Sequence, residues 1–98
     1  MLFRHAVGAV LRASRVSQGR SLREVASVAG MSIGYLSEVE RGHKEASSEL
    51  LAAAASALGL RVSELVSRAA EQMVAADAAV SVLTIPSQEQ RQRPVSAA

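Results

Sequence analysis

Apolar residues recur every three or four positions along most of this chain, which is the spacing of amphipathic helices. The pattern predicts helices over 3–18, 21–30, 32–41, 47–59 and 63–80. Serines stand where four of these segments begin and glycines lie where four of them end, as expected for residues that cap helices. Only residues 80–85, VSVLTI, alternate as a short strand does, and they also fit an extension of the last helix.

Two of the short helices are joined by a tight turn. Residues 21–42 read SLREVASVAGMSIGYLSEVERG, in which Ser21 and Glu24 have the spacing of a capping box and Gly30 supplies the left-handed turn. This is the layout of a helix-turn-helix, whose second helix lies in the major groove of DNA. The alternative is a pair of packed helices with ordinary polar faces.

The second helix of this motif carries the candidate base-reading residues. Leu36 and Val39 point inward, and the residues left exposed are Ser32, Ile33, Gly34, Tyr35, Ser37, Glu38 and Arg41. Serine hydroxyls bond several base edges, a glutamate accepts from the cytosine amino group, and Ile33 fits a thymine methyl. Gly34 permits a close approach to the groove. An ordinary surface acid is an equal interpretation of Glu38.

Candidate phosphate contacts flank this helix. Arg23 lies near the start of the first helix of the motif, where free N–H groups also favour an anion. His43 and Lys44 follow the second helix, in a loop that would border the DNA backbone. We expect Tyr35 to donate to a phosphate, although its ring also fits the edge of the core. For Arg23 and His43 a solvated side chain is an equal alternative.

Arg15 and Glu40 are charged residues near otherwise apolar faces, in the first helix and at the end of the third. An ion pair between them would fix the recognition helix to the first helix. We therefore assign this pair a structural role and no catalytic one.

The composition argues against chemistry other than binding. The 98 residues include no cysteine, which excludes disulfides and thiolate metal sites and fits a reducing cytoplasm. His5 and His43, the only histidines, are far apart in the sequence, so we expect no metal. The sequence also lacks a glycine-rich phosphate loop and paired buried acids, and we expect neither an enzyme nor a cofactor.

The charge is uneven along the chain. The net charge is +2, yet residues 1–48 hold seven Lys/Arg against four Asp/Glu, and the remainder holds four against five. A basic first half suits DNA phosphates, although so mild a bias is common in other proteins. No apolar run approaches the ~18–20 residues that span a bilayer, so we expect no membrane partner.

The pattern divides the chain into a DNA-binding domain (1–66), an extension of the last helix (67–84) and a flexible tail (85–98) rich in Pro, Gln and Ser. The extension is longer than a compact domain needs. It carries an apolar stripe of Ala69, Ala70, Met73, Ala76 and Val80. We predict a homodimer interface there, because two copies are needed to read half-sites ~34 Å apart; packing within one chain is the alternative. The small apolar end of the tail is either a degradation signal for Clp-type unfoldases or an inert end.

Residues 5–66 resemble the Cro/C1-type (XRE, lambda-repressor-like) helix-turn-helix family. The matching stretches are LR-x-x-R at 11–15, SLREVA at 21–26, AG at 29–30, YLSEVERG at 35–42 and ALGL-x-x-SEL at 57–65. The resemblance implies a five-helix domain that binds double-stranded DNA as a homodimer, and it supports the Arg15–Glu40 pair. Ala46 and Ser48 depart from the family pattern, which often has a proline and a core leucine there; we expect a looser loop.

The segment KEASSELL at 44–51 is similar to actinobacterial regulators of Clp protease genes. This narrower resemblance implies a transcriptional activator, with RNA polymerase and Clp protease as further partners. The sequence therefore predicts a cytoplasmic, dimeric regulator that reads a palindromic operator. A repressor of the same fold, or an antitoxin-like interaction module that uses the last helix and the tail, is the alternative.

Overall fold

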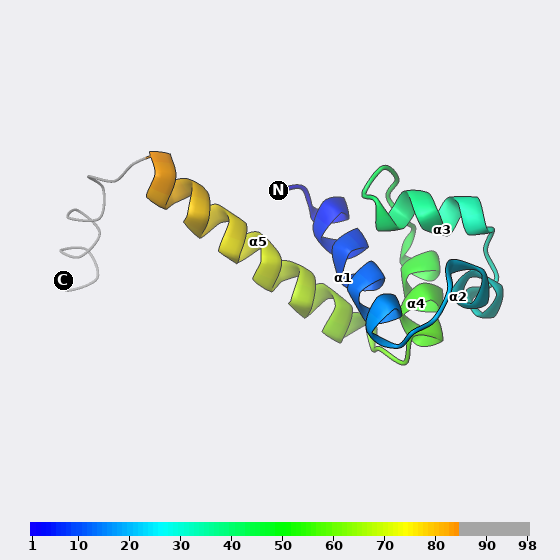
Figure 1. Cartoon of the computed structure of the whole chain (residues 1–98). Helices are drawn as coiled ribbons and strands as arrows, with labels where there is room; N and C mark the ends of the chain where they lie inside the picture. Colours follow the sequence, from blue (N-terminus) through cyan, green and yellow to red (C-terminus); the bar gives the residue numbers. More distant parts are fainter. Residues whose placement is uncertain (85–98) are drawn as a thin grey trace.

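Five helices make up the part of the chain that the computed structural model describes, namely the backbone of residues 1–84 and the side chains of residues 1–79. They are α1 (Phe3–Ser17), α2 (Leu22–Ala29), α3 (Ile33–Glu40), α4 (Ser48–Ala57) and α5 (Val62–Thr84) (Figure 1). The all-α fold is confirmed, and residues 80–84 continue α5 instead of forming a strand. The tail from residue 85, with its predicted flexibility and degradation signal, lies outside the described residues.

The predicted helix caps are present at three helix starts. Ser21, Ser32 and Ser47 accept hydrogen bonds from the third residue of α2, α3 and α4, and Ser21 forms the full capping box with Glu24. The prediction that Ser63 caps α5 is wrong. The helix begins at Val62, and the carboxylate of Glu64 accepts the preceding free N–H, that of Arg61, at 2.9 Å.

The core is built from aliphatic side chains. Leu11, Val25, Leu36 and Leu65 are the largest fully buried side chains, one from each of four helices, and Ala54 and Ala55 of α4 complete the centre. Alanines at this position let α4 pack closely against its neighbours, α2 and α5. A core of this kind removes apolar surface from water without a fully buried aromatic side chain.

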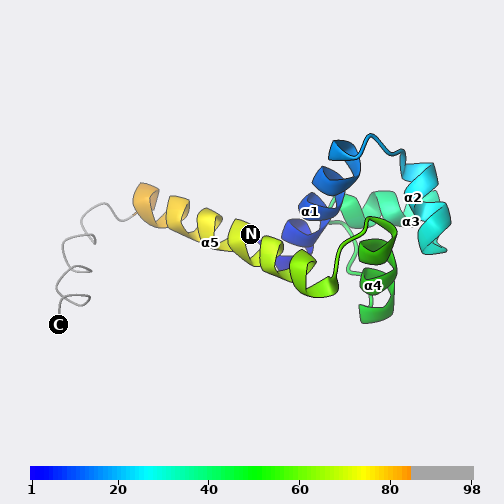
Figure 2. The ribbon, with the colours of Figure 1, turned by 90° about the horizontal axis from the view of Figure 1, so that it is seen from below.

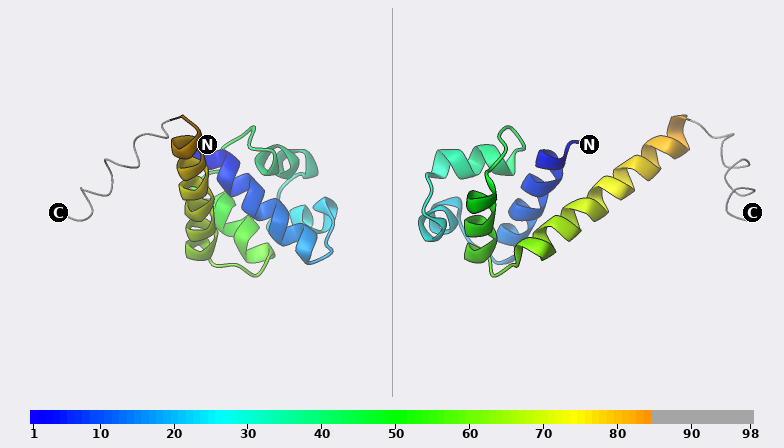
Figure 3. Two further views of the ribbon diagram at one scale, coloured as in Figure 1. Left: turned by 60° about the vertical axis from the view of Figure 1, so that its left-hand side comes forward. Right: turned by 180° about the vertical axis from the view of Figure 1, so that it is seen from behind.

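The helices α1–α4 form a compact group from which α5 extends. In Figure 1, α5 starts beside the end of α1, runs back along it, and continues past the other helices. Figures 2 and 3 show the same projection from three further directions. The second half of α5 therefore has no neighbouring helix within the described chain.

No single helix among residues 1–84 is long and apolar enough to cross a membrane. Helix α4 and the first part of α5 meet the length and composition criteria only when taken together, and they are bent by 98° relative to each other.

Candidate nucleic-acid interface

The predicted recognition helix, α3, is buried on one face and open on the other. Leu36, Val39 and Glu40 are buried, whereas Gly34 and Arg41 are exposed. In Figure 1, α3 lies along an outer edge of the group, on the side away from the projecting half of α5. The helix can therefore present its open face to a partner without displacing the rest of the fold.

A two-bond ion pair fixes the end of α3 to α1. The Nε atom of Arg15 donates to Oε2 of Glu40 at 2.8 Å, and Nη2 donates to Oε1 at 3.0 Å. The two side chains are 13% and 4% exposed, so water screens the pair little. The hydrogen bonds to Glu40 raise the pKa of the Arg15 guanidinium, against the effect of burial, and the charge of Glu40 adds to this rise. The pair inferred from the sequence is thus present.

A second contact holds the turn after α3. Nε of Arg4 donates to the carbonyl oxygen of Gly42 at 3.0 Å. Gly42 has a φ of 76°, and a β-carbon there would lie 2.3 Å from the ring of His5. This position therefore needs a glycine for both its conformation and its close packing.

The close approach of α1 and α3 depends on Gly8. A β-carbon at Gly8 would lie 2.4 Å from the carbonyl oxygen of Val39 and 2.5 Å from that of Glu40. Arg4, Gly8 and Arg15 thus all contact the end of α3 from α1. Sequence reasoning missed Arg4 and Gly8, although their spacing from Arg15 places all three on one face of a helix.

The candidate base-reading residues divide into two groups. Gly34 faces open space, and Ser37 and Glu38 are half-exposed beside Arg41. By contrast, Ser32 is engaged as the cap of α3, and Ile33 packs partly on the core. The open face is therefore centred on Gly34, Ser37, Glu38 and Arg41.

Tyr35 lies at the edge of the core, which was one of the two positions expected for it. Its ring packs against buried residues, and its hydroxyl lies 3.4 Å from the carbonyl oxygen of Glu45, to which it donates. This contact joins α3 to the loop that follows it. Glu45 is itself exposed.

The basic phosphate candidates are exposed on α2 and in the loop after α3. Arg23 lies in the first turn of α2, and His43 and Lys44 lie directly after α3. Of these three, only His43 is close to an acidic side chain within the described part of the chain, with Nδ1 lying 3.4 Å from Oε1 of Glu38. The same region holds no group of three or more metal-ligating side chains.

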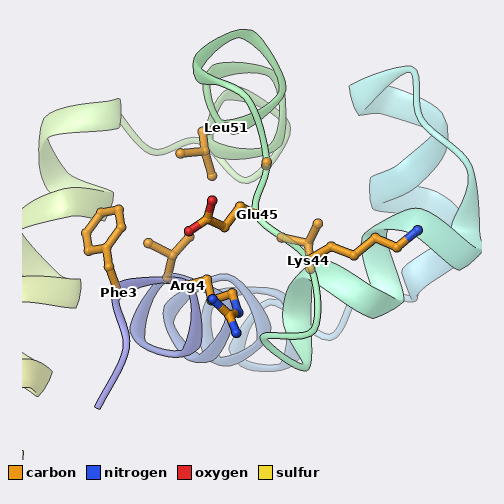
Figure 4. Close-up of a pocket in the computed structure, with 8 residues that line it drawn as sticks. Phe3, Arg4, Lys44, Glu45 and Leu51 are labelled. Carbon is orange, nitrogen blue, oxygen red and sulfur yellow. The ribbon is translucent and has the colours of Figure 1, made fainter.

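A pocket of about 220 Å³ lies beside the loop after α3, lined by Phe3, Arg4, Val7, Val39, Lys44, Glu45, Ala46 and Leu51. Figure 4 shows the ammonium group of Lys44 pointing away from Phe3, while the carboxylate of Glu45 points towards it. Ala46 contributes only a methyl group to the pocket, and Ser48 is exposed. Ala46 and Ser48, the two positions that depart from the family pattern, thus add no large side chain to this pocket.

The residues of the predicted dimer stripe on α5 do not share one exposed face. Ala69 is fully buried within the chain, so it has no surface to offer a second copy, and Met73 packs partly on the same core. Ala76 is half-buried, whereas Ala70 is exposed. The side chain of Val80 lies outside the described ones. The outward face of α5 is formed instead by residues such as Ala70, Val74 and Ala78.

Two short helices joined by a glycine turn, with the second helix open on one side and anchored by α1 on the other, define a helix-turn-helix domain. The helix-turn-helix family matches residues 11–65, and the chain belongs to this family.

The more specific comparisons concern one type of regulator. The chain is similar to the transcriptional regulator ClgR of Mycobacterium tuberculosis, in strains CDC 1551 / Oshkosh and ATCC 25618 / H37Rv. In both cases the identity is 57% over 72 residues, which cover 74% of this chain and 64% of the relative. The matched part of the chain therefore spans somewhat less than two thirds of the length of these curated relatives.

The fold also matches solved structures of the clp gene regulator ClgR from Corynebacterium glutamicum. One has a TM-score of 0.75 and 46% identity, and the match covers 88% of this chain and 97% of that one. A second has a TM-score of 0.70 and 51% identity, covering 72% and 91%. The resemblance to XRE-type proteins and to regulators of Clp protease genes is thus confirmed.

Proposed function

We propose that this protein is a sequence-specific, DNA-binding transcriptional regulator that inserts α3 into the major groove. The observation that carries the proposal is the way α3 is held. Its inner face and last turn are fixed by Leu36, Val39 and the Arg15–Glu40 pair, while its other face is open and bordered by basic side chains. A helix positioned rigidly with a free polar face meets the requirement for reading base edges.

Salt dependence tests this proposal directly. Each phosphate contact releases counterions, so six contacts would lower the affinity for duplex DNA about 10³-fold between 50 mM and 200 mM salt. Fluorescence anisotropy with a labelled duplex measures this slope. An affinity that does not change with salt would overturn the proposal and favour an interaction module.

We further propose that two copies bind together, because one small domain covers too little DNA for tight, specific binding. The projecting half of α5 supports this, since Val74 is 67% exposed there and Ala70 and Ala78 lie exposed four residues on either side. A second copy packed on this face would bury them and join two recognition helices in one dimer.

Replacing Val74 with glutamate tests the interface without disturbing the core. A charge at Met73 would be less suitable, because Met73 packs against the core. We expect V74E to sediment as a monomer at concentrations where the wild type is a dimer. Ala52→Glu is the matched control, because Ala52 is an exposed alanine on α4. A V74E protein that dimerises as tightly as the A52E protein would contradict this assignment.

The relatives named as regulators of clp genes support a target class as well. We propose that the protein activates genes for Clp protease and related proteostasis factors from a palindromic operator, with RNA polymerase as a partner. Measuring clp transcripts in cells with and without the protein tests both the target and the sign of regulation. A rise of these transcripts on deletion would indicate a repressor.

A further inference from the structure

The open face of α3 contains one acidic side chain, which pairs with an arginine and lies near a histidine. Oε2 of Glu38 pairs with Nη2 of Arg41, one turn later on the same face, and Oε1 lies 3.4 Å from Nδ1 of His43. All three side chains reach solvent: Arg41 is 58% exposed, His43 56% and Glu38 32%. The carboxylate therefore lies between two residues that would otherwise be available to DNA phosphates.

The backbone fixes this arrangement. The left-handed Gly42 ends α3 and turns the chain, so that the N–H of His43 donates to the carbonyl oxygen of Glu38 at 2.9 Å. This is the 6→1 hydrogen bond of a Schellman motif. It fixes the backbone of His43 beside that of Glu38, so that the two side chains are within reach of each other. Arg4, which donates to Gly42, holds the same turn to α1.

The charges lead to a specific consequence for any duplex that reaches this face. A phosphate at this face competes with Glu38 for the guanidinium of Arg41, and the Glu38 carboxylate faces the negative charge of the DNA. That cost is offset only where a base offers a donor to the carboxylate, which in the major groove is chiefly the amino group of cytosine. A repulsive element of this kind discriminates between partners by penalising the wrong one.

We propose that Glu38 is a specificity-determining residue that withholds Arg41 and His43 from DNA lacking a cytosine donor at its position. The inference rests on the proposed DNA-binding function and assigns a mechanism of discrimination to the same surface. It accounts for an acidic residue in the middle of a surface that otherwise presents Arg41, His43 and Lys44.

The test compares two duplexes of equal length and base composition, one carrying the site selected by the wild type from random DNA and one scrambled. We expect Glu38→Gln to bind the scrambled duplex about twofold more tightly per copy, or about fourfold for two copies, which is the scale of an exposed ion pair. The selected duplex should not share this gain, because glutamine prefers adenine. The ratio of the two affinities therefore falls at least fourfold.

Glu71→Gln is the matched control, because it makes the same change of charge at an exposed position on α5 and should leave the ratio unchanged. In an R41A/H43A background, most of the gain from E38Q on the scrambled duplex should disappear. An E38Q protein with an unchanged ratio, or a gain that persists in full without Arg41 and His43, would overturn the inference alone. A wild type that binds neither duplex would overturn the proposed function and the inference together.

Discussion

Removing the positive end of the Arg15–Glu40 pair should destabilise the domain strongly. Arg15→Ala leaves the Glu40 carboxylate, 4% exposed, without its two donors at the end of a helix that has no basic residue in its last turn. Breaking a buried pair costs 3–5 kcal/mol. We expect about 3 kcal/mol, the lower end of that range, because Arg15 is 13% exposed and water reaches the edge of the pair.

Thermal unfolding followed by circular dichroism measures this loss. For a domain of this size 1 kcal/mol corresponds to about 4–8 °C, so the melting temperature should fall by roughly 12–24 °C. All proteins are compared at one concentration, since dimerisation would make the melting temperature depend on it.

Arg12→Ala is the matched control. Arg12 is an exposed arginine on the same helix, with no ion pair to another described side chain, and its loss should change the free energy of unfolding by less than about 0.5 kcal/mol. The double variant R15M/E40L should recover most of the stability lost by R15A, because it removes both charges. An R15A protein as stable as R12A would show that the pair does not stabilise the fold.

Three further outcomes are expected from single residues. Gly8→Ala should cost about 1–3 kcal/mol by forcing α1 away from α3, and urea unfolding measures it; wild-type stability would show that the two helices separate freely. Lys44→Ala should weaken binding to all duplexes alike and reduce the salt slope by about 1 per copy, and a changed base preference would contradict its role as a phosphate contact. Hydrogen bonds from the Ser21 backbone and hydroxyl lower the pKa of Glu24. The ionised carboxylate therefore stabilises the fold at pH values above the ordinary pKa of a glutamate. This stabilisation is lost as the pH falls through the lowered pKa of Glu24. Unfolding curves of E24Q and wild type should accordingly converge in acid, and a difference that is independent of pH would exclude this effect.

Local signals in the sequence were enough to locate most of the helices. Ser21, Ser32 and Ser47 begin helices because a serine before an apolar period satisfies free N–H groups whatever the tertiary context. Ser63 failed as a predictor because α5 begins one residue earlier, at Val62, where the carboxylate of Glu64 accepts the N–H of Arg61.

Packing contacts between helices were only partly predictable. The Arg15–Glu40 pair could be inferred because two charges on apolar faces require partners. Arg4 donates to a backbone carbonyl oxygen. The sequence therefore contains no complementary side chain that would indicate this contact. The apolar stripe containing Ala69 and Met73 was identified, but periodicity does not distinguish a face that covers its own core from one that covers a second copy.

The most direct test of DNA reading by α3 is selection of duplex sites from a random DNA pool by the purified protein at moderate salt. We expect a palindrome with half-sites about one helical turn apart and with cytosine at the position facing Glu38. No enrichment by a protein shown to be folded would contradict the claim that α3 reads DNA.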